Sequence, residues 1–344
     1  MSTESALQAT IQALVQEGKG LLAADESGPT IAKRFKTIAV ESTEENRRAW
    51  RTLLLSTPGL GEFVSGVILY EETLGQCADD GTPLPELAAR QQIVPGIKVD
   101  AGKIPLALAL ALAPGDEITQ GLDGLAARLD GYRRQGARFA KWRAVYNVSA
   151  TLPGHAAIEA NAEALARYAA ICQEAGVVPI VEPEVLMDGD HSIGRCAQVT
   201  DAVLHAVLNA LHRHRVVLAH MLLKPSMVVA GSTHTAQPAP AEVAEATVRL
   251  LRSAVPAEVP GIFFLSGGQT PEEATAHLDA MNRIAGRPWL LSFSYGRALQ
   301  EPPLAAWKGQ AANVRAAQAA LLLRARLNGA ACRGQYDAAM ERTA

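Results

Sequence analysis

The sequence predicts an α/β protein built as a single (β/α)8 TIM barrel, in which eight parallel strands are surrounded by helices. Eight short apolar runs recur along the 344 residues, and each is followed by a longer stretch with helical spacing. The runs are apolar nearly throughout, as expected of parallel strands that are covered on both faces. They are residues 20–25, 64–70, 93–100, 138–143, 177–182, 216–224, 262–266 and 290–295. A doubly wound open sheet is the main alternative, but the glycine-rich fingerprint that normally follows its first strand is missing.

Helix signals fill the gaps between these runs. Ser42 and Glu45 have the S-x-x-E spacing of a capping box, and Thr270-Pro271-Glu272-Glu273 repeats the signal with proline at the first helical position. Two further gaps carry apolar stripes, the first of which stops at Gly176, a residue type that ends helices in the left-handed conformation. The stripes are Ile158, Leu165, Ala169 and Cys172, and then Val199, Val203, Val207 and Leu211.

Two stretches interrupt the alternation. The alternating Leu and Ala of residues 106–113 predict an edge strand or hairpin after the third barrel strand, and residues 230–240 predict a loop after the sixth. No linker separates the repeating units, so residues 1–344 are expected to form one catalytic domain. Residues 1–19 are expected to be a helix outside the barrel, and residues 331–344 a C-terminal tail.

The composition excludes several classes of protein. The 32 Lys and Arg residues nearly balance the 35 Asp and Glu residues, which argues against a general nucleic-acid binder. The most apolar run, residues 104–113, is about half a membrane span, so no membrane association is expected. The first twenty residues lack the pattern of a signal peptide, and four scattered cysteines without a CxxC fit free thiols in a reducing cytosol. The histidines show no metal-ligand spacing, so a cytoplasmic protein without a metal is expected.

Each apolar run ends in groups that ionise or donate hydrogen bonds. This matters because the active sites of such barrels lie where the strands end and the loops begin. A single polar group there fits a solvated loop start, but eight together predict one site at the barrel's mouth. The groups are Asp25 with Glu26, Glu71, Lys98, Lys141 with Arg143, Glu182 with Glu184, Lys224, Ser266 with Gly267 and Gly268, and Tyr295 with Gly296 and Arg297.

The use of lysine indicates which chemistry this site performs. Only eight lysines accompany 24 arginines, yet Lys98, Lys141 and Lys224 lie inside or at the end of apolar runs, where a charge is costly. A lysine whose pKa is lowered by burial and a neighbouring cation becomes a nucleophile toward carbonyls, which a guanidinium cannot do. The alternative for each lysine is an ion pair with one of the carboxylates at the strand ends.

The last two strand ends indicate an anion site. Ser266-Gly267-Gly268 lets backbone amides approach a ligand closely, and a helix is expected to open behind it at Thr270-Pro271. Gly296 and Arg297 add a second close approach and a guanidinium. Barrels frequently hold phosphate at the loops after strands seven and eight, so a phosphate is the expected ligand.

With these residues in place, the chain resembles the class I fructose-bisphosphate aldolases of glycolysis and gluconeogenesis. The resemblance runs in family order from about residue 20 to residue 335. The stretches that carry it are Leu21-Leu22-Ala23-Ala24-Asp25-Glu26-Ser27, Thr43-Glu44-Glu45-Asn46-Arg47-Arg48, Gly96-Ile97-Lys98-Val99-Asp100, Thr119-Gln120-Gly121-Leu122-Asp123-Gly124-Leu125, Phe139-Ala140-Lys141-Trp142-Arg143, Val178-Pro179-Ile180-Val181-Glu182-Pro183-Glu184, Leu222-Leu223-Lys224-Pro225, Phe264-Leu265-Ser266-Gly267-Gly268-Gln269 and Phe293-Ser294-Tyr295-Gly296-Arg297-Ala298-Leu299-Gln300.

The resemblance implies a role for each catalytic position. Lys224 is similar to the lysine that forms a Schiff base with the ketone, and Lys141 to the cation that helps keep that amine neutral. Glu182 is similar to the acid and base that dehydrates the carbinolamine, with Glu184 as its partner. Asp25 is similar to the carboxylate that takes the hydroxyl proton as the carbon–carbon bond breaks.

The resemblance also implies which residues bind the sugar phosphate. Lys98 and Arg143 match substrate-binding cations, while Ser27 and Thr30 fall where hydroxyls meet the distal phosphate. The phosphate nearest the ketone matches Ser266, Gly267, Gly268, Ser294, Gly296 and Arg297. No cofactor is implied, because the protonated imine takes the place of a metal ion, and a homotetramer is the expectation from the family.

Some positions depart from the family's pattern. Gly28-Pro29-Thr30 replaces Thr-Gly-Ser, which keeps a hydroxyl in a stiffer loop, and Ser226 stands where Asn usually follows Lys-Pro. Residues 106–113 replace a polar stretch. The chain reads to Ala344, soon after Tyr336, so the terminal tyrosine that assists proton exchange in many members is expected to be replaced by another group or to leave that step slower.

Three functional hypotheses follow. The first is an aldolase that cleaves fructose 1,6-bisphosphate to dihydroxyacetone phosphate and glyceraldehyde 3-phosphate through a lysine Schiff base. The second is a related Schiff-base lyase or transaldolase-like enzyme with another sugar phosphate. The third is a catalytically silent sugar-phosphate-binding or scaffold protein on the same barrel, against which Lys141, Glu182 and Lys224 together argue.

Overall fold

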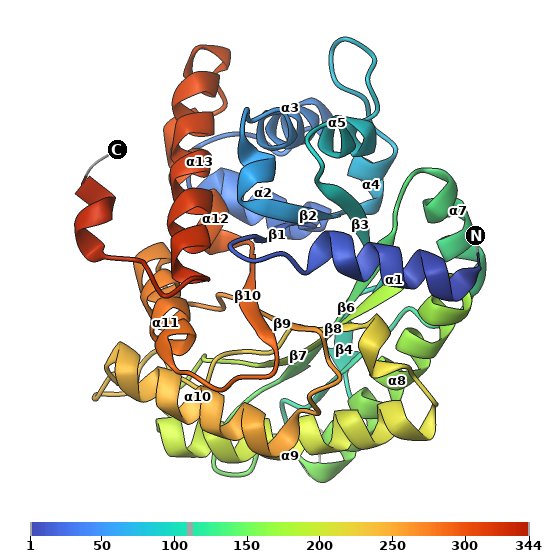
Figure 1. Ribbon diagram of the computed structural model, residues 1–344, viewed down its shortest axis with the longest axis vertical. Helices are drawn as coiled ribbons and strands as arrows, with labels where there is room; N and C mark the ends of the chain where they lie inside the picture. The colour runs from blue at the N-terminus through green and yellow to red at the C-terminus, as the bar shows by residue number, and fades with distance from the viewer. Residues whose placement is uncertain (1, 109–112, 343–344) are drawn as a thin grey trace.

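The computed structural model describes residues 2–108 and 113–342, in which eight parallel strands close into a barrel wrapped by helices (Figure 1). Around the barrel the strand order is β1-β10-β9-β8-β7-β6-β3-β2. The barrel strands are β1 (Gly20–Ala24), β2 (Val64–Leu69), β3 (Val94–Lys98), β6 (Phe139–Tyr146), β7 (Val178–Val185), β8 (Leu222–Leu223), β9 (Gly261–Phe264) and β10 (Leu290–Tyr295). The prediction of a (β/α)8 barrel is therefore confirmed.

Helices join successive strands on the outside of the barrel, and short 3-10 helices supplement them. The α-helices are α1 (Thr3–Leu14), α2 (Gly28–Lys36), α3 (Glu44–Leu55), α4 (Glu71–Leu74), α5 (Leu84–Arg90), α7 (Leu125–Arg134), α8 (His155–Glu174), α9 (Ile193–Arg213), α10 (Pro240–Ala254), α11 (Pro271–Arg283), α12 (Arg297–Trp307) and α13 (Val314–Ala331). The 3-10 helices are η1 (Leu60–Glu62), η2 (Leu218–His220), η3 (Ala311–Asn313) and η4 (Ala338–Arg342). No helix in the two described ranges is both long and apolar enough to cross a membrane.

The helix signals are confirmed in α8, α9 and α11 and wrong by one residue in α3. Thr270 caps α11 in a complete capping box with Glu273, and Gly176 follows α8 in the left-handed conformation. At α3, however, the side chain of Thr43, not Ser42, accepts the amide hydrogen bond of Asn46. Two adjacent hydroxyl residues give the same sequence signal, and the entering backbone decides which of them caps the helix.

The prediction of a sixth strand over residues 216–224 is wrong for most of its length. Residues Leu218–His220 form η2, and only Leu222–Leu223 pair as β8. The side chain of Gln173 on α8 accepts from the amide of Val217 and donates to its carbonyl. The backbone at Val217 is thus satisfied without a neighbouring strand, and an apolar run alone does not reveal that.

The segment after β3 forms a hairpin, which is one of the two structures predicted for it. Its strands, however, flank the Leu/Ala segment: β4 (Lys103–Pro105) pairs antiparallel with β5 (Glu117–Thr119). Residues 106–108 are not in a strand, and residues 109–112 lie outside the described residues. The loop predicted over residues 230–240 is confirmed up to the start of α10 at Pro240.

Inward-facing side chains change character along the barrel axis. At the N-terminal ends of the strands they are apolar, and α1 covers this end by packing against β2, β3 and β7 (Figure 1). Leu14 of α1 joins Phe139 and Phe263 in this cluster, and a Cβ at Gly96 would clash with the ring of Phe139. The close approach of Phe139 therefore requires glycine there. The division of residues 1–344 into one domain and a tail remains a prediction.

Candidate functional site

A cavity of about 500 Å³ opens at the C-terminal ends of the barrel strands. It collects most of the predicted site residues, although these come from positions scattered along the chain. Those lining it are Asp25, Ser27, Thr30, Lys98, Lys141, Arg143, Glu182, Glu184, Lys224, Ser266, Gly267, Ser294, Gly296 and Arg297. Gly268, Glu71 and Tyr295 do not line it: Glu71 begins α4, and Tyr295 is buried with its hydroxyl donating to the carbonyl of Ala274. Gly268 lines a smaller neighbouring hollow, where its amide donates to the sulfur of Met187.

At the centre of the cavity, one carboxylate lies between two buried ammonium groups. Glu182 of β7 has one oxygen 3.0 Å from Nζ of Lys224 and the other 3.3 Å from Nζ of Lys141. All three side chains are buried, and Lys224 directly follows β8. The ion-pair alternative is therefore observed for Lys224 and Lys141. That Lys224 is a nucleophile stays a prediction, and a carboxylate in this position could also exchange a proton with a group bound to Lys224.

Asp25 belongs to the same cluster of buried charges. Its carboxylate follows β1 and lies 2.7 Å from Nζ of Lys141. Burial alone would raise the pKa of Asp25, but the charges of Lys141, Lys224 and Lys98 outweigh burial and hold the pKa well below its usual range. Asp25 is therefore a carboxylate at any pH at which the protein works.

Lys141 has the opposite shift. Burial disfavours its charge, but Asp25, Glu182 and Asp100 more than compensate and raise its pKa above the usual range. Lys141 therefore supplies the fixed positive charge of the cluster. The carboxylate of Asp100, a residue without a predicted role, also lies 2.7 Å from Nζ of Lys98. Its place two residues after Lys98, in a run that ends in charge, is the signal that could have identified it.

Arg143 and Glu184 form a pair at the mouth of the cavity. Arg143 lies within β6, as predicted, and Glu184 lies within β7 because that strand extends beyond its predicted end. The guanidinium Nε of Arg143 donates to Glu184. Burial would raise the pKa of Glu184, but Arg143 and the two lysines lower it, so the Arg143 guanidinium faces a carboxylate.

The loops after β9 and β10 meet as predicted for an anion site. Gly267 has φ +57°, a conformation that favours glycine, and its carbonyl accepts from the guanidinium of Arg297 at the start of α12. Ser294 on β10 is fully buried and lines the cavity, and its hydroxyl has no partner among the described residues. A buried hydroxyl without a partner is costly, so a ligand oxygen here would satisfy it.

Two residues without a predicted role, Gln269 and His277, support this loop through hydrogen bonds. The side-chain nitrogen Nε2 of Gln269 donates to the carbonyl of Ser266 at 2.9 Å. Nδ1 of His277 on α11 lies 2.6 Å from the side-chain oxygen of Gln269. Because that oxygen can only accept, Nδ1 of His277 carries the hydrogen. Burial lowers the pKa of His277 to about 4, so the ring is neutral at pH 7. A buried neutral histidine at this distance from the loop has no signal in the sequence.

The opposite side of the cavity is formed by the start of α2. Ser27 and Thr30 place their hydroxyls 3.2 Å apart there, and Arg34 also lines the cavity. Arg34 is held by the buried carboxylate of Glu26, which in turn lies 2.6 Å from the guanidinium of Arg51. Arg34 has no separate motif, but it lies one helical turn after Thr30 and could have been placed on the same helix face.

No group of three or more potential metal ligands was found in residues 2–108 and 113–342. The cavity's carboxylates instead face lysines and arginines. Its donor set is therefore suited to a phosphorylated, carbonyl-containing ligand, with cations for the phosphates and a lysine for the carbonyl.

Comparison with known proteins gives a consistent result. A family model described as "Fructose-bisphosphate aldolase class-I" matches residues 6–344. A "Probable fructose-bisphosphate aldolase class 1" from Xanthomonas campestris is 53% identical over 337 residues, which cover 98% of this chain and 99% of the relative. "Fructose-bisphosphate aldolase 5, cytosolic" from Arabidopsis thaliana is 53% identical over 95% of this chain and 90% of its own length. The structure of a Plasmodium falciparum fructose-bisphosphate aldolase in complex with TRAP and a small-molecule inhibitor superposes with a TM-score of 0.95 at 49% identity, covering 97% of this chain and 96% of that one.

Proposed function

The chain belongs to the class I fructose-bisphosphate aldolase family, and we propose that Lys224 forms the Schiff base through which it acts. It is a carbon–carbon lyase that cleaves fructose 1,6-bisphosphate to dihydroxyacetone phosphate and glyceraldehyde 3-phosphate, and it catalyses the reverse condensation. The observation that supports the proposed chemistry is the position of Glu182, with one oxygen 3.0 Å from Nζ of Lys224 and the other 3.3 Å from Nζ of Lys141.

Schiff-base formation uses this trio first. The neutral amine of Lys224 attacks C2 of the ketone, and the resulting carbinolamine loses its hydroxyl as water. Glu182 takes the proton that Lys224 loses when it becomes a neutral amine, and then gives that proton to the leaving hydroxyl, since it lies within hydrogen-bond reach of the lysine nitrogen. The product is a protonated imine on Lys224. Lys141 keeps its proton through this step, because its raised pKa makes it the fixed charge.

Cleavage then needs a base and an electron sink. Asp25 takes the proton from the C4 hydroxyl, the C3–C4 bond breaks, and its electron pair moves into the protonated imine to give an enamine. The aldehyde leaves as glyceraldehyde 3-phosphate. Protonation of the enamine at C3 and hydrolysis of the imine release dihydroxyacetone phosphate and restore Lys224. The protonated imine accepts the electrons far better than a ketone does, which is the task of a metal ion in other aldolases.

The two phosphates fix the sugar between the reacting groups. We assign the phosphate nearest the ketone to the loops after β9 and β10. The buried hydroxyl of Ser294, beside these loops, has no hydrogen-bond partner among the described residues. The distal phosphate is assigned to Ser27 and Thr30, while Lys98 and Arg143 bind the chain between them. Holding both ends converts the attack into a step between positioned groups. The first phosphate site comprises Ser266, Gly267, Gly268, Ser294, Gly296 and Arg297.

Reductive trapping tests the assignment of Lys224. Borohydride added with dihydroxyacetone phosphate is expected to attach the triose covalently to Lys224 and to abolish cleavage, and peptide mass spectrometry locates the label. Lys224→Met is expected to lose at least about 10⁴-fold in turnover, whereas Lys36→Met, an exposed lysine outside the cavity, is expected to retain it. A label elsewhere, or cleavage that survives borohydride but is lost with EDTA, would refute the mechanism.

Steady-state cleavage separates this enzyme from a lyase for another sugar phosphate. Both phosphate sites line one cavity, so fructose 1,6-bisphosphate is expected to have a higher kcat/KM than fructose 1-phosphate, with or without chelator. A clear preference for the monophosphate would assign the Ser27 and Thr30 side of the cavity to another ligand group.

We also propose where the enzyme is located in the cell and how it assembles. The four cysteines are free, and the Arabidopsis relative is named cytosolic, which supports a cytoplasmic location. A homotetramer without a cofactor, bound to neither nucleic acid nor membranes, is the corresponding proposal for its assembly. Light scattering coupled to gel filtration measures the assembly directly, and a mass of one chain would contradict it.

A further inference from the structure

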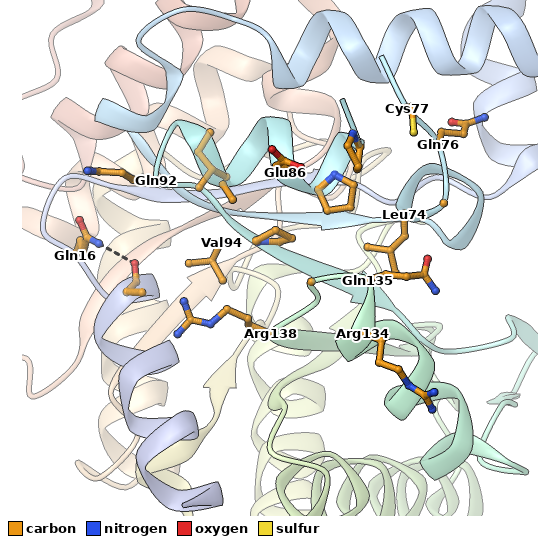
Figure 2. Close-up of a pocket in the computed structure, with 18 residues that line it drawn as sticks. Gln16, Leu74, Gln76, Cys77, Glu86, Gln92, Val94, Arg134, Gln135 and Arg138 are labelled. Carbon is orange, nitrogen blue, oxygen red and sulfur yellow. Dashed lines mark hydrogen bonds between the residues drawn. The ribbon is translucent and has the colours of Figure 1, made fainter. Parts of the chain in front are cut away.

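A second, larger cavity of about 870 Å³ lies near the opposite end of β3 (Figure 2). Its walls come from the end of α1, the loop after α4, α5, the start of β3 and the loop between α7 and β6. It shares no lining residue with the catalytic cavity. Val94 lines this cavity and Lys98 lines the catalytic cavity. These residues are four positions apart on β3, which corresponds to about 13 Å along the strand.

Part of the lining of this cavity is apolar and buried. The buried apolar residues that line it include Leu74, Pro85, Ile93, Val94 and Pro95. Proline fixes the backbone, so these walls lose little freedom when a ligand binds. A flat apolar group would thus find a preorganised surface of the size usual for small-molecule sites.

The charged side chains at the edge of this cavity differ in whether they have a partner of opposite charge. Arg134 lies in an ion pair with Asp130, and Glu86 lies 2.8 Å from Arg90, so both are neutralised by neighbours on their own helices. The guanidinium of Arg138 has no ion pair within the described ranges, and it lies beside Val94 at the edge of the cavity (Figure 2). The charge left over at this rim is therefore positive.

We propose that this cavity binds a small organic anion with a flat apolar body, such as an aromatic carboxylate or sulfonate. The apolar body would lie on Val94, Pro95 and Pro85, and the acidic group would pair with Arg138. The cavity is separate from the sugar-phosphate site, so this ligand would bind without competing with substrate.

The chain carries its own reporter for occupancy. Cys77 lines the cavity and is exposed, whereas Cys172 and Cys196 are buried and Cys332 is half-buried. The probe is 8-anilinonaphthalene-1-sulfonate, which has the proposed chemistry and is fluorescent when bound in an apolar site. One molecule per chain is expected to bind and to slow alkylation of Cys77 at least threefold, as measured by peptide mapping. Saturating dihydroxyacetone phosphate is expected to leave this binding unchanged.

Three variants locate the probe. Arg138→Gln is expected to raise its Kd about tenfold, while Arg133→Gln, which changes an exposed arginine near the end of α7 that does not line the cavity, is expected to leave the Kd unchanged. Ala89→Trp fills the cavity from α5 and is expected to abolish protection of Cys77, with unchanged cleavage activity showing that the barrel is folded. No binding below millimolar probe, displacement by dihydroxyacetone phosphate, or an unchanged Kd in Ala89→Trp would each overturn the proposal. Equal effects of Arg138→Gln and Arg133→Gln would overturn the assignment of the anion to Arg138.

Discussion

At the N-terminal end of the barrel, β6 points Phe139 into an apolar cluster with Leu14 and Phe263, whereas two residues later it points the ammonium of Lys141 among carboxylates. The same change occurs on β7, where Ile180 belongs to the apolar cluster and Glu182 to the cavity. One end is built for burial of apolar surface and the other for buried charge.

The difference shows how the barrel tolerates its site. Burying a charge costs several kcal/mol even when it is paired, so the charged end contributes little net stability. Each fully buried apolar side chain at the other end contributes about 1.5–3 kcal/mol. Stability and chemistry are therefore separated along the barrel axis, and substitutions at the two ends are expected to have separable effects.

Removing Lys141 is expected to have the largest effect. Lys141→Met leaves Asp25, Glu182 and Asp100 without their shared cation, and breaking such a buried set costs about 3–5 kcal/mol in free energy of unfolding. Cleavage is expected to fall as well. Urea unfolding and steady-state kinetics measure the two effects, with the exposed Lys36→Met as the control. Unchanged stability would mean that the carboxylates are solvated and not held by Lys141.

At the apolar end, Leu14→Ala is expected to cost about 2–5 kcal/mol through the cavity it leaves, with kcat/KM unchanged in the folded protein. Val217→Ala, which trims a half-exposed side chain, serves as the control and is expected to change stability by less than about 0.5 kcal/mol. A fall in kcat/KM for Leu14→Ala would contradict the separation of the two ends.

The loop behind the charged end predicts a dependence on pH. His277 has a pKa of about 4 when buried and 6.5 ordinarily, so the unfolded chain binds the extra proton between these values. Its contribution to stability is fully present above pH 6.5 and is lost as the pH falls toward 4. Between pH 7 and pH 5 the wild type is expected to lose about 2 kcal/mol relative to His277→Asn. Unfolding free energies with parallel pH profiles would show that His277 is not held neutral.

The same histidine acts through Gln269 on Ser266, so it is a positioning residue for the proposed phosphate loop. His277→Ala is expected to raise the KM for fructose 1,6-bisphosphate severalfold with little change in kcat, and His277→Asn, which keeps a donor, to restore part of it. Equal losses in kcat for both variants would point to a disrupted fold.

The smallest effect is expected at Ser294, whose hydroxyl has no partner among the described residues. Ser294→Ala is expected not to destabilise the free enzyme, because no hydrogen bond is lost and a buried hydroxyl without a partner is removed. The KM is expected to rise by about three- to tenfold if the hydroxyl meets a phosphate oxygen, which corresponds to about 1 kcal/mol. A KM equal to that of the wild type would remove Ser294 from the phosphate site.

Much of the cavity could be predicted because strand ends in a parallel barrel converge. Asp25, Lys141 and Lys224 are 199 positions apart at the extremes, yet each ends or follows an apolar run, and that position alone places them at one mouth. Gly268 was one exception: a glycine in the right motif, but its amide meets Met187 in the structure. The direction of the Gly268 amide depends on its packing against Met187, which follows β7, and the sequence does not reveal that contact.

The strand bounds show where the pattern was insufficient. Residues 216–224 are apolar enough for a strand, but the side chain of Gln173 satisfies the backbone there and leaves only Leu222–Leu223 paired. Conversely, β6 and β7 extend past the predicted ends to Tyr146 and Val185, because paired strands continue through charged residues when these face a partner of opposite charge.

The eight-fold alternation, the set of charged strand ends and the resemblance to the aldolase family could be recognised without a structure, since these depend on local periodicity and residue type. Only the packed barrel shows which carboxylate faces which lysine, that Asp100 pairs with Lys98, that Arg34 lines the cavity, and that His277 supports the loop after β9 through Gln269. Those choices depend on distances of about 3 Å between residues far apart in the chain, and such distances are fixed only when the whole barrel has closed.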